Sequence, residues 1–262
     1  MKNESEWDGA VLRDLSSDWA ERVVFFPQCG STNDEACELA TKGAGDWTVV
    51  LTERQGAGRG RRGQRWISPP REGLAFSMVV RPRGPAALWS RLALSAGLAV
   101  AEGLEVFGVS AGLKWPNDVR VGGRKISGIL VESGSDFLVV GVGVNVNVTR
   151  FPEGLEFPAT SLALETGRME RREAVLVSCL DRLRLRLRQS EEEFEAVRQA
   201  WSERCVLTGK VVTMDVGGQR KTGRVEGLAA NGELLLRGSD GLERILQADL
   251  IREVDSRSSD PW

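Results

Sequence analysis

The 262-residue sequence contains no histidine and no tyrosine. Without histidine, the protein lacks the side chain that most often acts as a general base near neutral pH, and also the usual nitrogen ligand of zinc. A bound metal ion would therefore have to rest on oxygen ligands, which favours Mg²⁺. Any catalysis by this chain must proceed without an imidazole.

Cysteine is scarce as well, and Cys29, Cys37, Cys179 and Cys205 show no C-x-x-C spacing. We interpret them as reduced thiols of a cytosolic chain. No apolar run approaches the roughly 18 residues that a membrane span needs. The start of the chain, MKNESEWDGA, lacks the apolar core of a secretory signal. We therefore expect a cytoplasmic protein that makes no contact with a membrane.

A strong net charge is also missing. The formal net charge is −2, with 41% hydrophobic and 27% charged residues, as in an ordinary soluble globular protein. General nucleic-acid binders neutralise many phosphates, so a slightly acidic chain is not expected to be one. The length suits one large domain, or one with a small appendage.

Against this background, residues 54–71 (RQGAGRGRRGQRWISPPR) carry arginines among glycines and prolines without one acid. Glycine lets a ligand approach the backbone closely, and guanidinium groups bind phosphate or carboxylate in a bidentate manner. This basic loop, residues 54–71, is therefore predicted to bind an anion. From these residues alone, two alternatives stay open: a solvated flexible loop, and an Arg/Gly segment that binds RNA.

Gly58, Gly60 and Gly63 also match the dinucleotide pattern G-x-G-x-x-G. That pattern requires a helix that begins at the glycines. Trp66 and two prolines follow instead, and they cannot open such a helix. We therefore do not interpret the loop as a Rossmann fingerprint, and no P-loop pattern is present.

A helix is expected to begin near Ser31 or Thr32. Either residue is a good N-cap, and acids three residues further on resemble a capping box. The simple interpretation of Ser31, Thr32 and Asn33 is therefore capping. The functional alternative is that three small polar side chains at a helix N-terminus form a socket of directed hydrogen bonds.

Apolar patterns predict the other elements of this part of the chain. Strands are expected at 22–26, 48–52, 74–81 and 136–147, and helices at 85–106, 170–189 and 191–205. The basic loop then connects two strands, so its ends are fixed while its middle can move. The run LRLRLR alternates like a strand, but no turn residue interrupts it, and we keep the helix there.

A turn at 114–118 (KWPND) precedes a hairpin with strands at 119–121 and 124–132. The turn offers a cation, an indole, an amide and a carboxylate, which is unusual for a simple turn. Lys125 lies on the second strand of this hairpin, and an alternative to a functional role is that it is an ordinary surface lysine. Strict alternation places Lys125, Ser127, Ile129 and Val131 on one face of the second strand, and Ile126, Gly128, Leu130 and Glu132 on the other.

Polar and side-chain-free positions interrupt the apolar strand at 136–147. Gly141 and Gly143 lack side chains, which suggests that another group packs flat against the strand. Asn145 and Asn147 need hydrogen-bond partners if they are buried.

From Gly209 the sequence changes to short strands around glycine turns, including Asn231-Gly232 and Asp240-Gly241. About fifty residues of this kind predict a small β-barrel. We divide the chain into a larger domain, residues 1–206, and a barrel domain with its tail, residues 207–262. Residues 1–20 are interpreted as a strapping segment and 255–262 as a loose tail.

Taken together, these motifs resemble the biotin protein ligase family of the BirA type. They follow in that family's order: STN at 31–33, Gln55 with GRGRRG at 58–63 and Trp66, KWPND at 114–118, RKISGILVE at 124–132, and GVGVN at 141–145. The resemblance covers nearly the whole larger domain and implies an α+β fold. Its catalytic domain would be like those of class II aminoacyl-tRNA synthetases and biotin ligases, a mixed sheet flanked by helices. A small SH3-like β-barrel would follow.

The resemblance implies a two-step ligase reaction. Biotin's carboxylate attacks the α-phosphate of ATP, with Mg²⁺ present, and gives biotinyl-5′-AMP and pyrophosphate. A lysine of the biotin carboxyl carrier domain of a carboxylase then attacks the adenylate. The first step mainly requires charge neutralisation and alignment, so the absence of histidine is no obstacle.

The resemblance also implies roles for single residues. Biotin would be bound by Ser31, Thr32, Asn33, Gln55, Arg59, Gly60, Arg61, Lys125 and Gly128, and the nucleotide by Arg59, Arg61, Trp66, Lys114, Asn117, Lys125 and Asn145. Lys125 and Arg61 would be catalytic, and we expect Asp118 to help deprotonate the incoming lysine. No protein ligand is assigned to Mg²⁺.

Two departures from the family pattern matter. Gln64 stands where a further arginine is frequent, and the N-terminal winged helix of the ligase-repressors is absent, so DNA operator binding is not expected. The sequence leaves open whether the chain forms a homodimer.

One alternative function is that of a lipoate or octanoate ligase or transferase of the same fold, although the STN motif and Gln55 favour biotin. The alternative of another class is an RNA-binding module, against which the net charge speaks.

Overall fold

The structure is a computed structural model that describes Trp7 and residues 23–254. The interpretations of residues 1–20 and 255–262 lie outside the described residues, apart from Trp7. The side chain of Trp7 is buried, and the guanidinium of Arg172 lies 5.2 Å from its ring centre. No helix within the described residues is long and apolar enough to cross a membrane.

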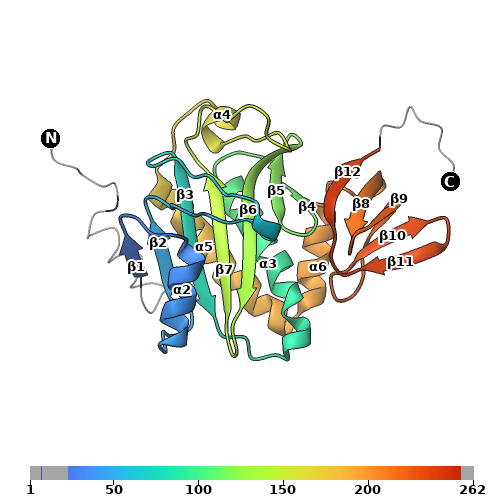
Figure 1. The fold of residues 1–262 in the computed structure, drawn as a ribbon, viewed down its shortest axis with the longest axis horizontal. Helices are drawn as coiled ribbons and strands as arrows, with labels where there is room; N and C mark the ends of the chain where they lie inside the picture. Colours follow the sequence, from blue (N-terminus) through green and yellow to red (C-terminus); the bar gives the residue numbers. More distant parts are fainter. Residues whose placement is uncertain (1–6, 8–22, 255–262) are drawn as a thin grey trace.

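A seven-stranded mixed sheet forms the centre of the larger part of the molecule (Figure 1). In spatial order its strands are β1 (Val23–Phe26), β2 (Val49–Thr52), β3 (Gly73–Val80), β7 (Leu138–Asn145), β6 (Arg124–Ser133), β5 (Asp118–Val121) and β4 (Gly112–Lys114). Only β1 and β2 run parallel; the other neighbours are antiparallel. Strands β3 and β7 are buried along their whole length, as expected for central strands made of apolar runs.

Helices cover both faces of this sheet (Figure 1). Helix α2 (Thr32–Thr41) packs on one face against β2, β3 and β7, while α3 (Ser90–Glu105), α5 (Arg172–Glu192) and α6 (Phe194–Glu203) lie on the other. A 3₁₀ turn, Ala86–Leu88, precedes α3, and the short α4 (Leu162–Thr166) lies near one end of the sheet. The predicted strands and helices are confirmed, with ends shifted by a few residues.

The helical interpretation of LRLRLR is confirmed, because the segment lies inside α5. Leu183 and Leu187, four residues apart, are fully buried, whereas Leu185 between them is 51% exposed. Only a helical period places the first and last leucines on one face and turns the middle one to solvent. Close packing of α5 on α3 requires Gly103, where a Cβ would lie 3.0 Å from the backbone of Cys179.

The strict alternation expected along β6 is wrong at its start. The register with β5 shifts, since Val119 pairs with Ser127 but Arg120 pairs with Lys125, which leaves Ile126 as an extra residue. Such a bulge turns one additional side chain to the opposite face. Ile126 is therefore buried in the core. Lys125 shares a face with Gly128, since a Cβ added at Gly128 would lie 3.1 Å from Nζ of Lys125.

A second, five-stranded sheet follows and is antiparallel throughout (Figure 1). Its strands are β8 (Val211–Val216), β9 (Gln219–Leu228), β10 (Leu234–Gly238), β11 (Gly241–Ile245) and β12 (Asp249–Glu253), in the spatial order β11-β10-β9-β8-β12. The predicted glycine turns are confirmed, and Gly232 and Gly241 adopt φ values of 91° and 113° that favour glycine.

A buried ion pair joins Glu53, the residue before the basic loop, to the first residue of α5. Arg172 is 1% exposed, and its two terminal nitrogens each lie 2.9 Å from a carboxylate oxygen of Glu53. Burial works to raise the pKa of Glu53, but the bonds and charges from Arg172 and Arg71 prevail, so the pKa lies below its ordinary value. The stability that Glu53 contributes is therefore present above its unfolded-state pKa and is lost as pH falls through the lower folded-state pKa.

We predict that Glu53→Gln destabilises the protein by about 3–5 kcal/mol, because it removes the carboxylate that balances the buried charge of Arg172. The measurement is the urea unfolding midpoint, followed by tryptophan fluorescence at pH 7. Glu226→Gln is the control, since it breaks an ion pair with Arg237 whose side chains are 36% and 54% exposed. This control is expected to change stability by no more than about 0.5 kcal/mol. Equal, small effects of both variants would contradict the prediction.

Candidate functional site

A cavity of 480 Å³ opens where α2, the basic loop, β6 and β7 meet the segment 148–159 and the start of β12. The predicted site residues that line it are Ser31, Thr32, Asn33, Gln55, Arg59, Gly60, Arg61, Trp66, Lys114, Asn117, Asp118, Lys125 and Gly128. Residues from distant parts of the sequence are thus brought to one place.

Asn145 is the predicted site residue that does not line the cavity. It is buried, and its Nδ2 donates to Thr160 O at 3.0 Å. Asn147 makes a similar bond to Glu170 O at 2.9 Å. Both side chains therefore hold the segment after β7 in place, as expected for buried amides that need partners.

The N-terminus of α2 forms one end of the cavity, and the capping interpretation is wrong there. Ser31 is the N-cap residue, but its side chain accepts no capping hydrogen bond. The N–H of Thr32 is satisfied instead by Oε1 of Gln55, at 2.9 Å. The helix end and the basic loop are thereby joined, and the small polar side chains are not used as caps.

Gly141 and Gly143 on β7 make room for two site side chains, as their lack of side chains suggested. A Cβ on Gly141 would lie 2.1 Å from Oδ1 of Asn33, and a Cβ on Gly143 would lie 2.2 Å from the indole of Trp66. The indole therefore lies flat on the strand. Its buried Nε1 has no hydrogen-bond partner among the residues that the structure describes.

Acids hold the basic loop at two points. Near α2, both terminal nitrogens of Arg59 donate to the carboxylate of Asp34 at 2.6 Å, which raises the pKa of Arg59 and lowers that of Asp34. At the other point, Nη2 of Arg61 lies 3.8 Å from Oδ1 of Asp249, and Arg62 contacts the same carboxylate. Burial lowers the pKa of Arg61.

Sequence reasoning missed Asp249, which follows the basic loop by nearly two hundred residues and lies on β12. No spacing or motif links a carboxylate in the second sheet to arginines of the first domain. The nearest signal was the absence of acids in the basic loop itself, which implies that its counter-charges come from elsewhere.

The KWPND turn connects the two sheets rather than only ending a strand. Nζ of Lys114 donates to Ile251 O at 2.6 Å and lies 4.3 Å from the ring centre of Phe157. Nε1 of Trp115 donates to Gly232 O at 3.1 Å. Asn117 fixes the turn to β6 through a 2.8 Å bond from Nδ2 to Ile129 O. Lys114 and Trp115 are both buried by these contacts.

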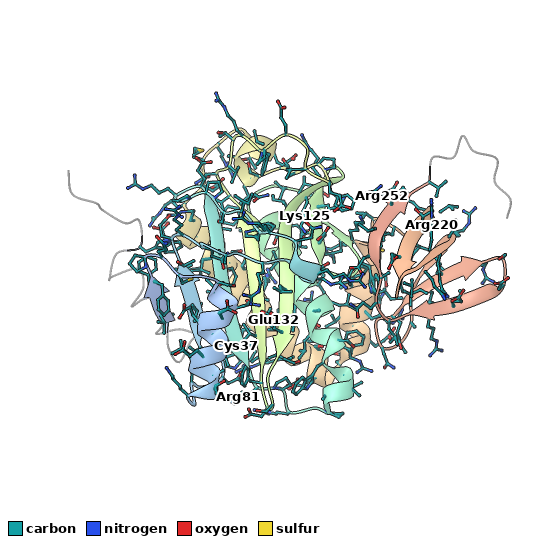
Figure 2. All side chains as sticks on the ribbon, viewed as in Figure 1. Cys37, Arg81, Lys125, Glu132, Arg220 and Arg252 are labelled. Carbon is teal, nitrogen blue, oxygen red and sulfur yellow. The ribbon has the colours of Figure 1, made fainter. Side chains whose placement is uncertain are left out.

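Lys125 and Asp118 form an ion pair in the cavity. Nζ of Lys125 lies 2.6 Å from Oδ1 of Asp118 and 5.8 Å from the Trp66 ring centre. Arg120 approaches the other oxygen of Asp118 at 3.5 Å. Figure 2 shows Lys125 toward the end of β6 that lies nearest the second sheet and the segment 148–159. The lysine is therefore placed among the other cations rather than on an open strand surface.

The comparisons with known proteins agree with this architecture. A family model described as "Biotin/lipoate A/B protein ligase family" matches residues 26–148, and one described as "Biotin protein ligase C terminal domain" matches residues 208–252. The fold and site thus define a member of the biotin and lipoate ligase class, and the expected α+β fold with a small C-terminal β domain is confirmed.

The chain belongs to the biotin protein ligase family. It is 36% identical to the biotin--[acetyl-CoA-carboxylase] ligase of Mycobacterium tuberculosis, over 87% of this chain and 89% of that protein. The Paracoccus denitrificans enzyme of the same name is 34% identical, over 84% and 96%. A biotin protein ligase structure from Aquifex aeolicus in complex with biotin and ATP superposes with a TM-score of 0.81 at 31% identity, over 89% of this chain and all of that one.

We predict that Lys114 titrates near pH 8. Burial and, next, the charge of Arg120 lower its pKa from 10.5 to about 8. Between pH 8 and 10.5 the lysine is protonated in the unfolded chain but mostly deprotonated in the folded one. The contribution of Lys114 to the free energy of unfolding therefore increases as pH rises through this range. The measurement is an NMR titration of ¹³Cε-labelled lysines, with Lys114→Met used to assign the signal. A Lys114 midpoint at or above 10.5 would contradict the prediction.

Proposed function

We propose that the chain is an ATP-dependent biotin protein ligase. It activates biotin to biotinyl-5′-AMP, with release of pyrophosphate, and transfers biotin to a lysine of a biotin carboxyl carrier protein. The observation that carries the proposal is that one cavity joins uncharged hydrogen-bonding groups to a cluster of cations. The names of the relatives support the same reaction.

The uncharged end suits the ureido ring of biotin, which has a carbonyl acceptor and two N–H donors. Ser31, Thr32, Asn33 and Gln55 surround this end of the cavity. Oε1 of Gln55 is already used by Thr32 N–H, so Gln55 has its Nε2 to donate to a ligand. Gly128 and Trp66 supply a flat wall for the apolar part of biotin.

The cationic end suits the reaction of two anions. An oxygen of the biotin carboxylate attacks the α-phosphorus of ATP, and the bond from that phosphorus to the pyrophosphate oxygen breaks. Arg61 and Lys125 reduce the repulsion between the two reactants and hold them in line, while the backbone at Gly60 allows close approach. Lys114 and Asn117 would complete the nucleotide side. Nothing in this step needs a covalent bond to the protein.

Arg59 differs from the other cations of the cavity in its contacts. Its guanidinium faces Asp34 and Glu132 rather than standing free, so its charge is already partly balanced. We propose that Arg59 places the backbone of the basic loop against biotin and the phosphate, and that Arg61 supplies the more direct positive charge.

Mg²⁺ enters the proposal together with ATP. The acids that line the cavity are Asp118, Glu156 and Asp249, and no cluster of three metal-ligating side chains occurs among the described residues. Mg²⁺ in nucleotide sites usually keeps waters and binds phosphates with one or two carboxylates. The donor set fits that arrangement, in which the ion neutralises phosphate charge while it is held mainly by the nucleotide.

Transfer to the carrier requires that the attacking lysine lose its proton. Asp118 is the carboxylate that lies in the cavity beside Lys125, so we propose that it accepts this proton directly or positions the amine. The proposed partner is a biotin carboxyl carrier domain in the cytoplasm. The proposal requires neither operator DNA nor a second copy of the chain.

Two other functions remain to be distinguished. A lipoate or octanoate ligase or transferase would use the same fold. Its acyl substrate, however, has no ureido group to occupy the polar end of the cavity. An RNA-binding module would present its arginines outward, whereas Arg59, Arg61 and Arg62 face acids of their own chain. Both observations favour biotin.

The test is pyrophosphate release with ATP and Mg²⁺ in the presence of biotin, lipoate, octanoate or no acid, each with a biotin carrier domain. We expect release with biotin alone, accompanied by a mass increase of one biotinyl group on the carrier lysine. Release with lipoate or octanoate instead of biotin would assign the chain to the alternative ligase. No release with any of the three acids would contradict every ligase function.

A separate prediction concerns Asp118→Asn. With preformed biotinyl-5′-AMP, we expect transfer to the carrier to slow by about 10²-fold or more, as for loss of a general base. The measurement is a single-turnover transfer assay at several pH values. Without the base, the rate of transfer should depend more strongly on pH, because the amine of the carrier lysine must then lose its proton to water. Normal transfer combined with slow adenylate formation would refute this role and restrict Asp118 to holding Lys125.

A further inference from the structure

Glu132 lies on β6 just outside the cavity and contacts two residues that line it (Figure 2). Its Oε2 accepts from Nδ2 of Asn33 at 2.6 Å, and both its oxygens lie 3.3–3.4 Å from Nη2 of Arg59. Figure 2 shows it beside α2, near Cys37. No motif assigned Glu132 a role, and it does not reach the cavity itself.

The contact with Glu132 decides which way the Asn33 amide faces. The two N–H groups of Asn33 point to Glu132 and to Leu130 O, at 2.6 and 3.3 Å, while its Oδ1 lies 2.6 Å from Oγ of Ser77. A reversed amide would place its oxygen against a carboxylate and a carbonyl, which are both acceptors only. Asn33 must therefore present its oxygen to Ser77.

This orientation determines where the hydroxyl protons lie. Ser77 has one proton and is fully buried, with Asn33 Oδ1 at 2.6 Å and Thr32 Oγ1 at 2.7 Å as its neighbours. Since Asn33 Oδ1 can only accept, Ser77 donates to it and must accept from Thr32. The competing contact from Thr32 Oγ1 to Gln55 Oε1 is 3.3 Å, which is longer than a good O–H···O bond.

With its proton directed to Ser77, Thr32 offers only acceptor lone pairs toward the cavity. Gln55 meanwhile has only its N–H₂ group to offer, because its oxygen accepts Thr32 N–H. An acceptor beside a donor complements the N–H and the C=O of a ureido group. An acyl chain without N–H groups cannot satisfy the acceptor, and burying an unsatisfied polar group is unfavourable.

We propose that Glu132 is a positioning residue that selects a ligand with an N–H donor, by fixing the chain of hydrogen bonds through Asn33 and Ser77 so that Thr32 acts as an acceptor. The inference rests on the proposed function, since biotin is the ligand with such a donor. Arg59 lies 3.3 Å from Glu132 as well, but its two bonds to Asp34 are shorter, at 2.6 Å, so the basic loop stays attached to α2 without Glu132.

The test compares Glu132→Ala and Ser77→Ala with the parent protein. Biotin affinity is measured by calorimetry, and kinetic constants for biotin and ATP are measured by pyrophosphate release. Both variants are expected to raise the Kd and KM for biotin about tenfold, the effect of one lost hydrogen bond in a buried site. The KM for ATP and the kcat are expected to change less than about twofold, because the cations of the reacting centre keep their places. Discrimination between biotin and octanoate should fall by the same factor.

Glu132→Gln is the rescue variant, because its side-chain oxygen can still accept from Asn33 although the charge toward Arg59 is lost. It is expected to keep biotin affinity within about threefold of the parent, or ~0.65 kcal/mol. Glu105→Gln is the matched control, since Glu105 is 33% exposed and pairs with Arg204 away from the cavity. We expect no effect of this control on either substrate.

The outcomes separate the two claims. A parent protein that neither binds nor activates biotin overturns the proposed function, and with it the role of Glu132. A parent that is active, with biotin affinity unchanged in Glu132→Ala and Ser77→Ala, overturns the role of Glu132 alone. An equal loss for biotin, octanoate and ATP would also overturn it, because that result indicates general damage rather than selection of an N–H donor.

Discussion

The structure depends on keeping a cluster of cations together before any anion is bound. Two like charges 4 Å apart repel each other by roughly 4 kcal/mol at an effective dielectric constant of about 20. The chain meets this constraint with acids taken from four places. Asp34 on α2 and Glu132 on β6 face Arg59, Asp118 faces Lys125, and Asp249 on β12 faces Arg61 and Arg62. Lys114 has a carbonyl and an aromatic ring instead, and its pKa falls to about 8.

This arrangement explains why the second sheet contacts the site. Asp249 balances the arginines of the basic loop, while Ile251 O and Gly232 O accept hydrogen bonds from Lys114 and Trp115. The KWPND turn and the basic loop therefore meet the C-terminal sheet on the same side of the cavity. A chain with no histidine thus gathers its charges in one cavity by balance and alignment, which is what the proposed joining of a carboxylate to a phosphate would demand.

Much of the fold, and most of the residues that line the cavity, could be predicted from the sequence, because the signals were local. Apolar periodicity gave the strands and helices, and Gly141 and Gly143 indicated the flat packing of Asn33 and Trp66. The errors arose where tertiary contacts override local rules. The bulge at Ile126 depends on the register with β5, and the use of Gln55 in place of a cap on α2 depends on a loop that lies 23 positions away. The contacts of Glu132 and Asp249 could not be predicted, because acids that balance charges across a cavity have no characteristic spacing in the sequence from the arginines they contact.

The central claim is that this chain activates its substrate by charge and alignment, without a nucleophile of its own. The most direct measurement mixes stoichiometric protein with biotin, ATP and Mg²⁺ in the absence of a carrier, stops the reaction in acid within the first turnover, and determines the intact mass of the chain and the small-molecule products. The account predicts an unchanged chain mass and about one biotinyl-5′-AMP recovered per pyrophosphate released. A chain that gains one biotinyl group while AMP is released in that first turnover would show a covalent intermediate and contradict the account.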